Sequence, residues 1–383
     1  MRPNKEDNMQ IDARISKLAE NILKNSVQLK KGEKIYIEAF GASTKDFFNE
    51  LIKETIKLGA VPFYFYNDAS FEKSLIEGAD KQQIEGYTSI HKRLMEEADC
   101  YVAVRGYDDV FALSDVRAED MDMFGKIFQE QVHMRTRLPK TRWCVMRWPN
   151  TSMAAMSRMS LQQFEDFYFE ACLLDYQKMG RAMQPLKELM DKTENVHIKG
   201  ADTDLTFSLK GIKAIVCDGR MNIPDGEVYS APVKDSINGY VQFNTDTMYD
   251  GVFYSNIRLE FENGKIIKGT SLVNNEKFQK MLDLDEGSRY MGEFAFGVNP
   301  YITHPILDIL FDEKTCGSFH MAIGNSYEDE TNNGNKSSIH WDLVKIQTKE
   351  HGGGEIWFDN TLVRKDGLFV LPELEGLNPQ NLK

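Results

Sequence analysis

The chain has 383 residues, of which 42% are hydrophobic and 27% are charged. That length and mix are typical of a globular protein with two domains, which can bury a sizeable core without disulfide or metal staples. The 46 basic and 59 acidic residues give a net charge of −13. Nucleic acids and anionic membranes need a basic face on their partner, so this charge argues against both.

The sequence also predicts a cytoplasmic protein. A bilayer-spanning helix needs about 18 or more consecutive apolar residues, and the sequence contains no such run. The charged N-terminal segment, MRPNKEDNMQIDARISKLAEN, lacks the apolar core of a signal peptide. The five cysteines are far apart in the chain, which is typical of reduced and mostly buried thiols.

Helical and strand patterns alternate in the first half of the chain. Apolar residues recur at helical spacing from Ile11 to Leu29, which predicts an amphipathic helix, and a second helix is predicted from Thr44 to Leu58. Strands are predicted at KIYIEAF, VPFYFY, DCYVAVRG and RWCVMRW. This alternation is typical of a mostly parallel sheet covered by helices. No GxGxxG motif follows a strand, so the dinucleotide-binding fingerprint is missing.

The pattern changes in the second half. A long helical pattern over residues 160–192 is followed, from Asn195 onward, by segments that alternate apolar and polar residues and break at Asn-Gly or Lys-Asp-Gly. Such breaks are hairpin signals and predict antiparallel strands. We therefore predict two domains: an N-terminal α/β domain, 1–192, with a mostly parallel sheet, and a C-terminal α+β domain, 193–383, rich in antiparallel strands.

Four short segments of the second half place acidic residues or histidines beside apolar strand residues. They carry Glu227, Glu293, His320, and the pair His340 and Asp342. Alternate residues of a strand share a face, so His340 and Asp342 point the same way. Glu293 and His320 each share their face with small residues, which leaves room for a ligand. A single polar side chain on a strand is usually just solvated, but four segments of one design indicate a common site.

Two glutamates, two histidines and one aspartate suit a divalent transition metal such as zinc, cobalt or manganese. A catalytic zinc site normally uses three protein ligands, so five ligands favour two ions that share a bridging carboxylate. The charges agree with this interpretation, because two divalent ions and three carboxylates leave one positive charge. A bridging hydroxide would balance that charge, and such a hydroxide is the nucleophile of two-metal hydrolysis.

The same segments resemble, in order, four motifs of the thermophilic metallo-aminopeptidase family, of the aminopeptidase T and aminopeptidase S type. NIPDGEVYSAP resembles the family's PxGEV-T-AP segment, and DEGSRYMGEFAFGVNP resembles its DEGS--LGE-AL-P segment. LFDEKTCGSFHMAIGNSY and IHWDL complete the series, which spans most of residues 220–345. The resemblance implies metal ligands at the five positions already named, with Glu293 bridging the two ions.

The resemblance also implies a catalytic role for Tyr327, whose phenol could donate a hydrogen bond to a tetrahedral oxyanion. At position 226 the chain has glycine where some relatives have a second glutamate, so no role carries over there. The implied function is an aminopeptidase that releases N-terminal residues from short peptides, acting as a homodimer. Two alternatives remain open: a non-catalytic metal-binding or peptide-binding module, and a different metallo-hydrolase on the same scaffold.

Overall fold

The computed structural model describes residues 12–109 and 111–383 of the chain. These residues form two compact units: the described residues up to Ser152 with Arg220–Ile223, and Met153–Gly219 with Pro224–Lys383. The domain boundary expected at residue 192 falls just after a helix inside the second unit. The division into 1–192 and 193–383 stays a prediction, because compactness alone does not test which segments fold independently.

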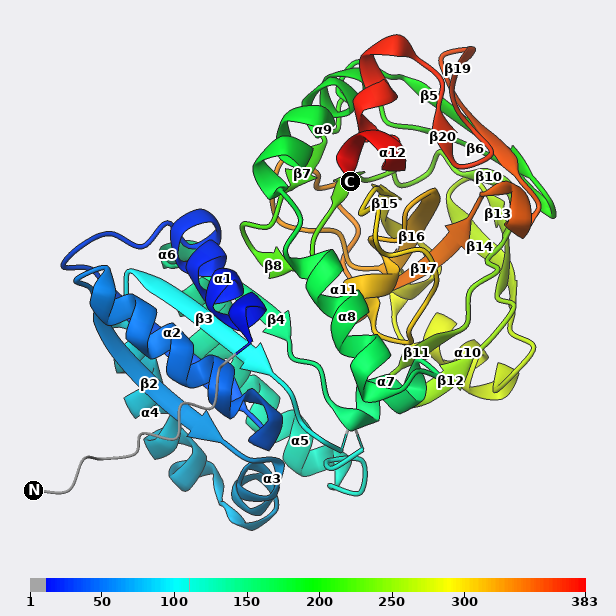
Figure 1. The fold of residues 1–383 in the computed structure, drawn as a ribbon. Coiled ribbons are helices and arrows are strands. Elements are labelled where there is room, and N and C mark those ends of the chain that lie inside the picture. The colour runs from blue at the N-terminus through cyan, green and yellow to red at the C-terminus, as the bar shows by residue number, and fades with distance from the viewer. Residues whose placement is uncertain (1–11, 110) are drawn as a thin grey trace, which may run out of the picture. The chain divides into compact units, whose positions relative to one another are not determined.

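The first unit is a parallel sheet with helices on both faces. Within the described residues, its strand order is β2-β1-β3-β4-β8, and every neighbouring pair is parallel. Figure 1 shows α1 and α2 on one face of this sheet and α4 on the other. The strands are β1 (Lys34–Phe40), β2 (Val61–Asn67), β3 (Cys100–Arg105), β4 (Arg142–Arg147) and β8 (Asn222–Ile223). The helices are α1 (Ala13–Asn21), α2 (Lys45–Lys57), α3 (Ala69–Gly78), α4 (Lys81–Glu97), α5 (Ala118–Phe124) and α6 (Leu138–Lys140), with π-helical turns at Ile22–Ser26 and Gly125–Arg137.

These elements confirm the parallel α/β arrangement expected for the first half. The four predicted strands are β1 to β4, and the second predicted helix is α2. The helix predicted from Ile11 to Leu29 is α1 followed by a π-helical turn, and Ile11 lies outside the described residues. Strand β8 is an addition that periodicity cannot reveal, because its two residues are too few to show a pattern.

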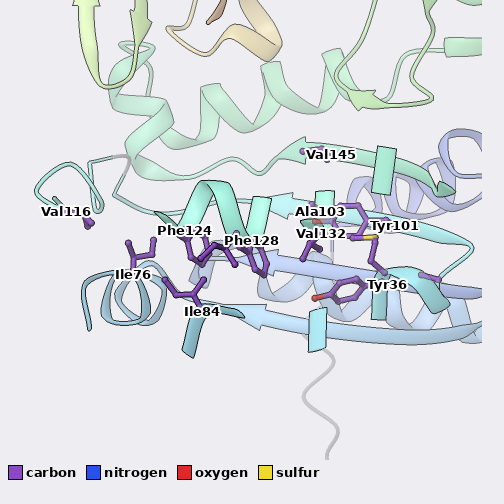
Figure 2. Close-up of a cluster of buried hydrophobic side chains, with 13 residues drawn as sticks. Tyr36, Ile76, Ile84, Tyr101, Ala103, Val116, Phe124, Phe128, Val132 and Val145 are labelled. Atoms are coloured by element: carbon purple, nitrogen blue, oxygen red, sulfur yellow. The ribbon is translucent and has the colours of Figure 1, made fainter. Parts of the chain in front are cut away.

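A cluster of buried hydrophobic side chains lies between this sheet and the helices on its α4 face (Figure 2). Tyr36 and Tyr101 come from the strands, and Phe128 comes from the π-helical segment Gly125–Arg137. The buried Glu38 accepts hydrogen bonds from both tyrosine hydroxyls, each at 2.5 Å. Burial opposes the charge of Glu38, but hydrogen bonds with His91 and the tyrosines outweigh it and lower the pKa of the carboxyl. The core of the first unit therefore contains a satisfied buried carboxylate.

The second unit begins with helices, and α7 (Thr151–Met156) contains the boundary between the units. The helical pattern over 160–192 is two helices, α8 (Leu161–Cys172) and α9 (Tyr176–Met190). They are separate because Asp175 caps α9, its side chain accepting a hydrogen bond from the Lys178 backbone N–H. The later helices are α10 (Asn275–Leu282), α11 (Ile309–Asp312) and α12 (Pro379–Leu382).

The rest of the second unit is largely antiparallel β-structure, as predicted. Among the described residues, an eight-stranded sheet has the order β14-β13-β10-β6-β5-β18-β19-β20, and a five-stranded sheet has the order β17-β16-β15-β9-β7. The first sheet comprises β5 (Asn195–Gly200), β6 (Thr203–Ser208), β10 (Asn238–Gln242), β13 (Arg258–Glu262), β14 (Lys265–Thr270), β18 (Gly354–Phe358), β19 (Thr361–Lys365) and β20 (Leu368–Phe369). The second comprises β7 (Ile215–Cys217), β9 (Glu227–Ser230), β15 (Met291–Gly297), β16 (Ser318–Gly324) and β17 (His340–Ile346), and a hairpin pairs β11 (Thr247–Tyr249) with β12 (Val252–Tyr254).

Aromatic side chains connect the two sheets of this unit. Phe294 of β15 lies 4.9 Å, between ring centroids, from Phe207 of β6, and Phe296 lies 6.0 Å from Phe358 of β18. Because alternate residues of a strand point to opposite faces, the other residues of β15 face away from the eight-stranded sheet. The part of the chain that the structure describes contains no helix long and apolar enough to cross a membrane.

Candidate metal centre

The five predicted ligands come together on the face of the five-stranded sheet that points away from the eight-stranded sheet. Glu227 begins β9, Glu293 lies in β15 and His320 in β16, whereas His340 and Asp342 lie in β17. Four of the five are buried, and the His340 side chain is 23% exposed. Strand pairing therefore collects in space residues that are more than a hundred positions apart in sequence.

On one neighbouring strand, a glycine or alanine stands opposite each predicted ligand and leaves room on the ligand face. On the other neighbouring strand, His320 faces Val344 and Glu227 faces Cys217. The pairs with glycine or alanine are Glu227 with Gly297, Glu293 with Ala322, His320 with Ala295, His340 with Gly324 and Asp342 with Ala322. The small residues that flank the ligands in sequence therefore also make room for them across the sheet.

Both histidines are held with Nε2 facing the carboxylates. The Nδ1 atom of His320 lies 3.0 Å from the backbone oxygen of Glu313, and that of His340 lies 2.8 Å from the backbone oxygen of Asn325. A carbonyl oxygen only accepts hydrogen bonds, so Nδ1 carries the hydrogen and Nε2 of the neutral ring presents a lone pair. This is how a second partner commonly orients a metal-binding imidazole.

The Nε2 atoms of the two histidines lie among carboxylate oxygens. His320 Nε2 is 3.2 Å from Glu293 Oε1 and 3.4 Å from Glu227 Oε2. His340 Nε2 is 3.3 Å from Glu293 Oε2 and 3.5 Å from Asp342 Oδ1. In the described residues Glu227 Oε2, Glu293 Oε2 and Asp342 Oδ1 are buried without a hydrogen bond of good geometry. Lone pairs at these distances repel one another unless a cation or a proton lies between them.

The donor set therefore fits a divalent cation. Glu227, Glu293 and His320 offer donor atoms within 4.8 Å of one another, and so do Glu293, His340 and Asp342. Carboxylate oxygens and imidazole nitrogens are ligands that zinc, cobalt and manganese accept. Because Glu293 belongs to both triads, the geometry is compatible with one ion or with two ions that share this residue.

Protons and metal ions compete for these groups. Burial opposes the charged form of His320, but its hydrogen bond with Glu293 and the charge of Glu227 outweigh burial and raise its pKa to about 9. For His340 too, Asp342 and Glu293 outweigh the effect of burial and hold the pKa well above its usual value. Burial opposes the charge of Asp342, yet His340 lowers its pKa to about 2. The carboxylates are thus available as ligands, while the histidines must lose a proton to bind metal.

Tyr327 lies in the loop after β16, and its hydroxyl reaches the same cluster. The hydroxyl oxygen is 3.3 Å from His340 Nε2, and the ring packs against those of His340 and Tyr229, with centroid distances of 4.9 and 5.4 Å. The residue is 43% exposed, so the ring borders solvent although the hydroxyl lies beside His340 Nε2. Desolvation of the hydroxyl and the charges of Glu293 and Asp342 raise its pKa well above the usual value. Tyr327 therefore remains a hydrogen-bond donor.

Sequence patterns do not identify three charged residues beside the cluster. Lys314 is 2% exposed, and its ammonium nitrogen lies 2.6 Å from Glu227 Oε1 and 2.7 Å from Glu313 Oε1. The same nitrogen lies 3.6 Å from Asp225 Oδ1. Burial raises the pKa of Glu313 to about 8 and that of Asp225 to about 6. These residues lie in loops, where no periodicity shows which way a side chain points; the available signal is a lysine directly after the acidic pair in LFDEKTCGSF.

Comparison with known proteins places this chain in a family. The family model described as thermophilic metalloprotease (M29) matches residues 11–367. The chain belongs to this family. Aminopeptidase T of Thermus thermophilus is 24% identical over 396 residues, covering 91% of this chain and 95% of that protein. Aminopeptidase PepS of Streptococcus thermophilus is 22% identical over 395 residues, covering 89% of this chain and 92% of that protein. Aminopeptidase AmpS of Bacillus subtilis is 32% identical over 163 residues, which cover 39% of each chain.

Family membership confirms the prediction of a metal-dependent peptidase, a hydrolase of peptide bonds, and implies a divalent metal ion. The solved structure of wild-type AmpT from Thermus thermophilus has a TM-score of 0.79 and is 21% identical, covering 94% of this chain and 99% of that one. A 2,5-dihydroxypyridine dioxygenase from Pseudomonas putida KT2440 has a TM-score of 0.61 and is 15% identical, covering 94% and 98%. Both similarities show the fold and confirm the predicted fold class, but a fold shared with a dioxygenase does not by itself decide an activity.

Proposed function

We propose that this protein is a metal-dependent aminopeptidase whose metal ligands are Glu227, Glu293, His320, His340 and Asp342. The observation that carries the proposal is that two imidazole Nε2 atoms lie among three buried carboxylate oxygens, Glu227 Oε2, Glu293 Oε2 and Asp342 Oδ1, that have no hydrogen bond of good geometry. Such a cluster favours a cation. Membership of a metalloprotease family supports a peptidase, and the aminopeptidases among the relatives support release of residues from the N-terminus.

We further propose that the centre holds two divalent ions, zinc, cobalt or manganese, with Glu293 as the shared ligand. Support comes from the position of Glu293, whose two oxygens face different histidines: Oε1 faces His320 and Oε2 faces His340. Glu227 completes the first triad, and Asp342 completes the second. A carboxylate that offers one oxygen to each of two triads is the usual form of a bridging ligand.

The five proposed ligands would hold divalent ions, which would supply Lewis-acid chemistry: polarisation of the scissile carbonyl and a lowered pKa of water. The Tyr327 hydroxyl donates a hydrogen bond to the carbonyl oxygen as the carbon becomes tetrahedral, where the developing negative charge strengthens that bond. A divalent ion held by the five proposed ligands would also accept the nitrogen lone pair of a free amine at the start of a peptide, which favours unblocked substrates. One of the carboxylates of the site accepts the proton that the attacking water loses and passes it to the amine that leaves when the C–N bond breaks.

The assembly and substrate size follow from the resemblance and stay proposals. We expect a homodimer with an enclosed site that admits short peptides and excludes folded proteins. Light scattering of the purified protein should then give twice the 44.0 kDa of one chain. A cytoplasmic location is expected from the sequence.

Hydrolysis of an unblocked dipeptide, compared with its N-acetylated form, tests the function. We expect the metal-loaded protein to cleave the unblocked dipeptide at least tenfold faster. Equal rates for the two forms would indicate a different hydrolase. Cleavage of neither form, by protein shown to contain metal, would indicate a non-catalytic binding module.

A further inference from the structure

Lys314 places an ammonium group directly beside the proposed metal centre. Its Nζ lies 2.6 Å from Glu227 Oε1, while the other oxygen of Glu227, Oε2, lies 3.4 Å from His320 Nε2. One oxygen of Glu227 therefore contacts the ammonium, and the other faces the proposed metal site. The ammonium leaves Glu227 a single oxygen with which to bind a metal ion.

The ammonium also lies where a further metal ion would find ligands. Cys217, Asp225 and Glu227 offer donor atoms within 4.8 Å of one another, as the two proposed triads do. The Nζ atom of Lys314 is in contact with two of these residues, at 3.6 Å from Asp225 Oδ1 and 2.6 Å from Glu227 Oε1. Glu313 supplies another carboxylate oxygen, at 2.7 Å. Lys314 thus has the surroundings of a bound cation.

The position of this ammonium is fixed by the fold. Lys314 is 2% exposed, and its backbone N–H donates to the Phe311 carbonyl at 2.9 Å. Its own carbonyl accepts from the Asn299 N–H at 3.1 Å. A buried ammonium is stable only when it is paired, and both the pairing and the backbone hold it here. The charge therefore remains next to Glu227 when the site binds or releases other cations.

We propose that Lys314 is a tethered cation of the metal centre. It holds Glu227 through Oε1, lies against the carboxyl groups of Asp225 and Glu313, and by charge repulsion weakens the binding of a divalent ion to the triad of Glu227, Glu293 and His320. This inference rests on the proposed metal centre. Lys314 acts through Glu227, so it is a positioning residue rather than a catalytic one.

Substitution of Lys314 tests the proposal through metal binding rather than activity. Lys314→Met removes the charge and keeps most of the side-chain volume, and Lys314→Gln, a second variant, keeps a hydrogen-bond donor. Lys345 provides a matched control, because it is also a buried lysine of the second unit, 3% exposed, but its Nζ donates to the carbonyls of Ala201 and Gln242. Full-length, metal-free proteins are titrated with cobalt or zinc against a competing chelator.

For the ion at the triad of Glu227, Glu293 and His320, we expect the affinity of each Lys314 variant to exceed that of the wild type by about tenfold or more. The reason is that like charges a few ångströms apart repel strongly even at high effective dielectric. Lys345→Met should leave the affinity unchanged. Unchanged or weaker binding by both Lys314 variants would overturn the inference. If the wild type itself binds no divalent ion, the proposed metal centre fails, and the two failures are thereby distinguishable.

Thermal unfolding gives a second, independent measurement. Removal of the tethered cation leaves buried carboxylates without a partner, so Lys314→Met should lower the unfolding temperature of the metal-free protein. Saturating zinc should raise the unfolding temperature of Lys314→Met by more than it raises that of the wild type, because tighter binding to the folded state stabilises it more. Lys345→Met should lose the same stability with and without zinc. Equal losses with and without zinc for Lys314→Met would contradict the proposal.

Discussion

Tyr327→Phe removes the one proposed catalytic group that is not a metal ligand. The substitution deletes the hydroxyl, which lies 3.3 Å from His340 Nε2, and keeps the ring that packs on His340 and Tyr229. Because the residue is 43% exposed and the ring volume is retained, no cavity forms in a core. We therefore expect the free energy of unfolding to change by less than about 1 kcal/mol.

The expected effect on turnover is much larger. Loss of one oxyanion donor typically lowers kcat by about 100- to 1,000-fold, or about 2.7–4 kcal/mol of transition-state stabilisation. KM should change much less, since the hydrogen bond strengthens only as the carbonyl becomes tetrahedral. Metal content should remain that of the wild type, because all five proposed ligands are retained.

Steady-state kinetics on an unblocked dipeptide, with both proteins reconstituted with the same metal and analysed for its content, provide the measurement. Tyr229→Phe is a suitable control, because it deletes a neighbouring hydroxyl that donates to Asp329 Oδ2 at 3.0 Å. It should retain most of the turnover. Near-normal kcat for Tyr327→Phe at full metal content would refute the reasoning and make Tyr327 a packing residue of its loop.

Three further predictions concern the metal and the first unit. Exhaustive EDTA treatment should abolish hydrolysis without unfolding the protein, as judged by circular dichroism, and cobalt, zinc or manganese should restore the rate; an unchanged rate in protein verified to be free of metal would show that no metal is needed. Glu293→Gln should lower the metal content measured by elemental analysis, and excess metal should restore little activity. His133 has its pKa lowered from 6.5 to about 4, mainly by burial, so below pH 6.5 the unfolded chain binds a proton that the folded chain does not. The free energy of unfolding therefore decreases as the pH falls from 6.5 towards 4, by about 2 kcal/mol at pH 5. Between pH 7.5 and 5, urea unfolding of His133→Gln should show a smaller decrease than that of the wild type. Equal decreases would contradict the lowered pKa of His133.

Much of the fold can be predicted because strands and helices differ in period. KIYIEAF coincides with β1, and the alternation in MGEFAFG correctly separates Phe294 and Phe296 from Glu293. Strand alternation also predicts which residues share a face with His340. The proximity of all five candidates, in contrast, depends on the order in which strands pair, and a single sequence does not contain that order. Their role as ligands stays a proposal.

Loop residues account for most of what could not be predicted. Asp225 and Lys314 lie outside strands, where side-chain direction depends on local turns and not on a period. The turn before β9 is set by Gly226, at φ 131°, and by Asp225, which accepts hydrogen bonds from the Gly219 and Gly226 N–H groups. Such contacts between distant loops give no repeating signal. The signal that the sequence does offer is the lysine directly after the acidic pair in LFDEKTCGSF.

The geometry of the centre is supplied by packing rather than by the metal. Phe294 and Phe296 are held against the eight-stranded sheet, so Glu293 and Ala295 must face the other way; a slip of one residue would exchange the two faces. The backbone at Gly297 lies so close to the chain at Thr315 that this position has no room for a side chain: a Cβ there would lie 2.3 Å from the Thr315 backbone oxygen. The proposed ligands are thus positioned by a register that the hydrophobic core enforces. For this reason the removal of metal should cost activity while leaving the fold intact.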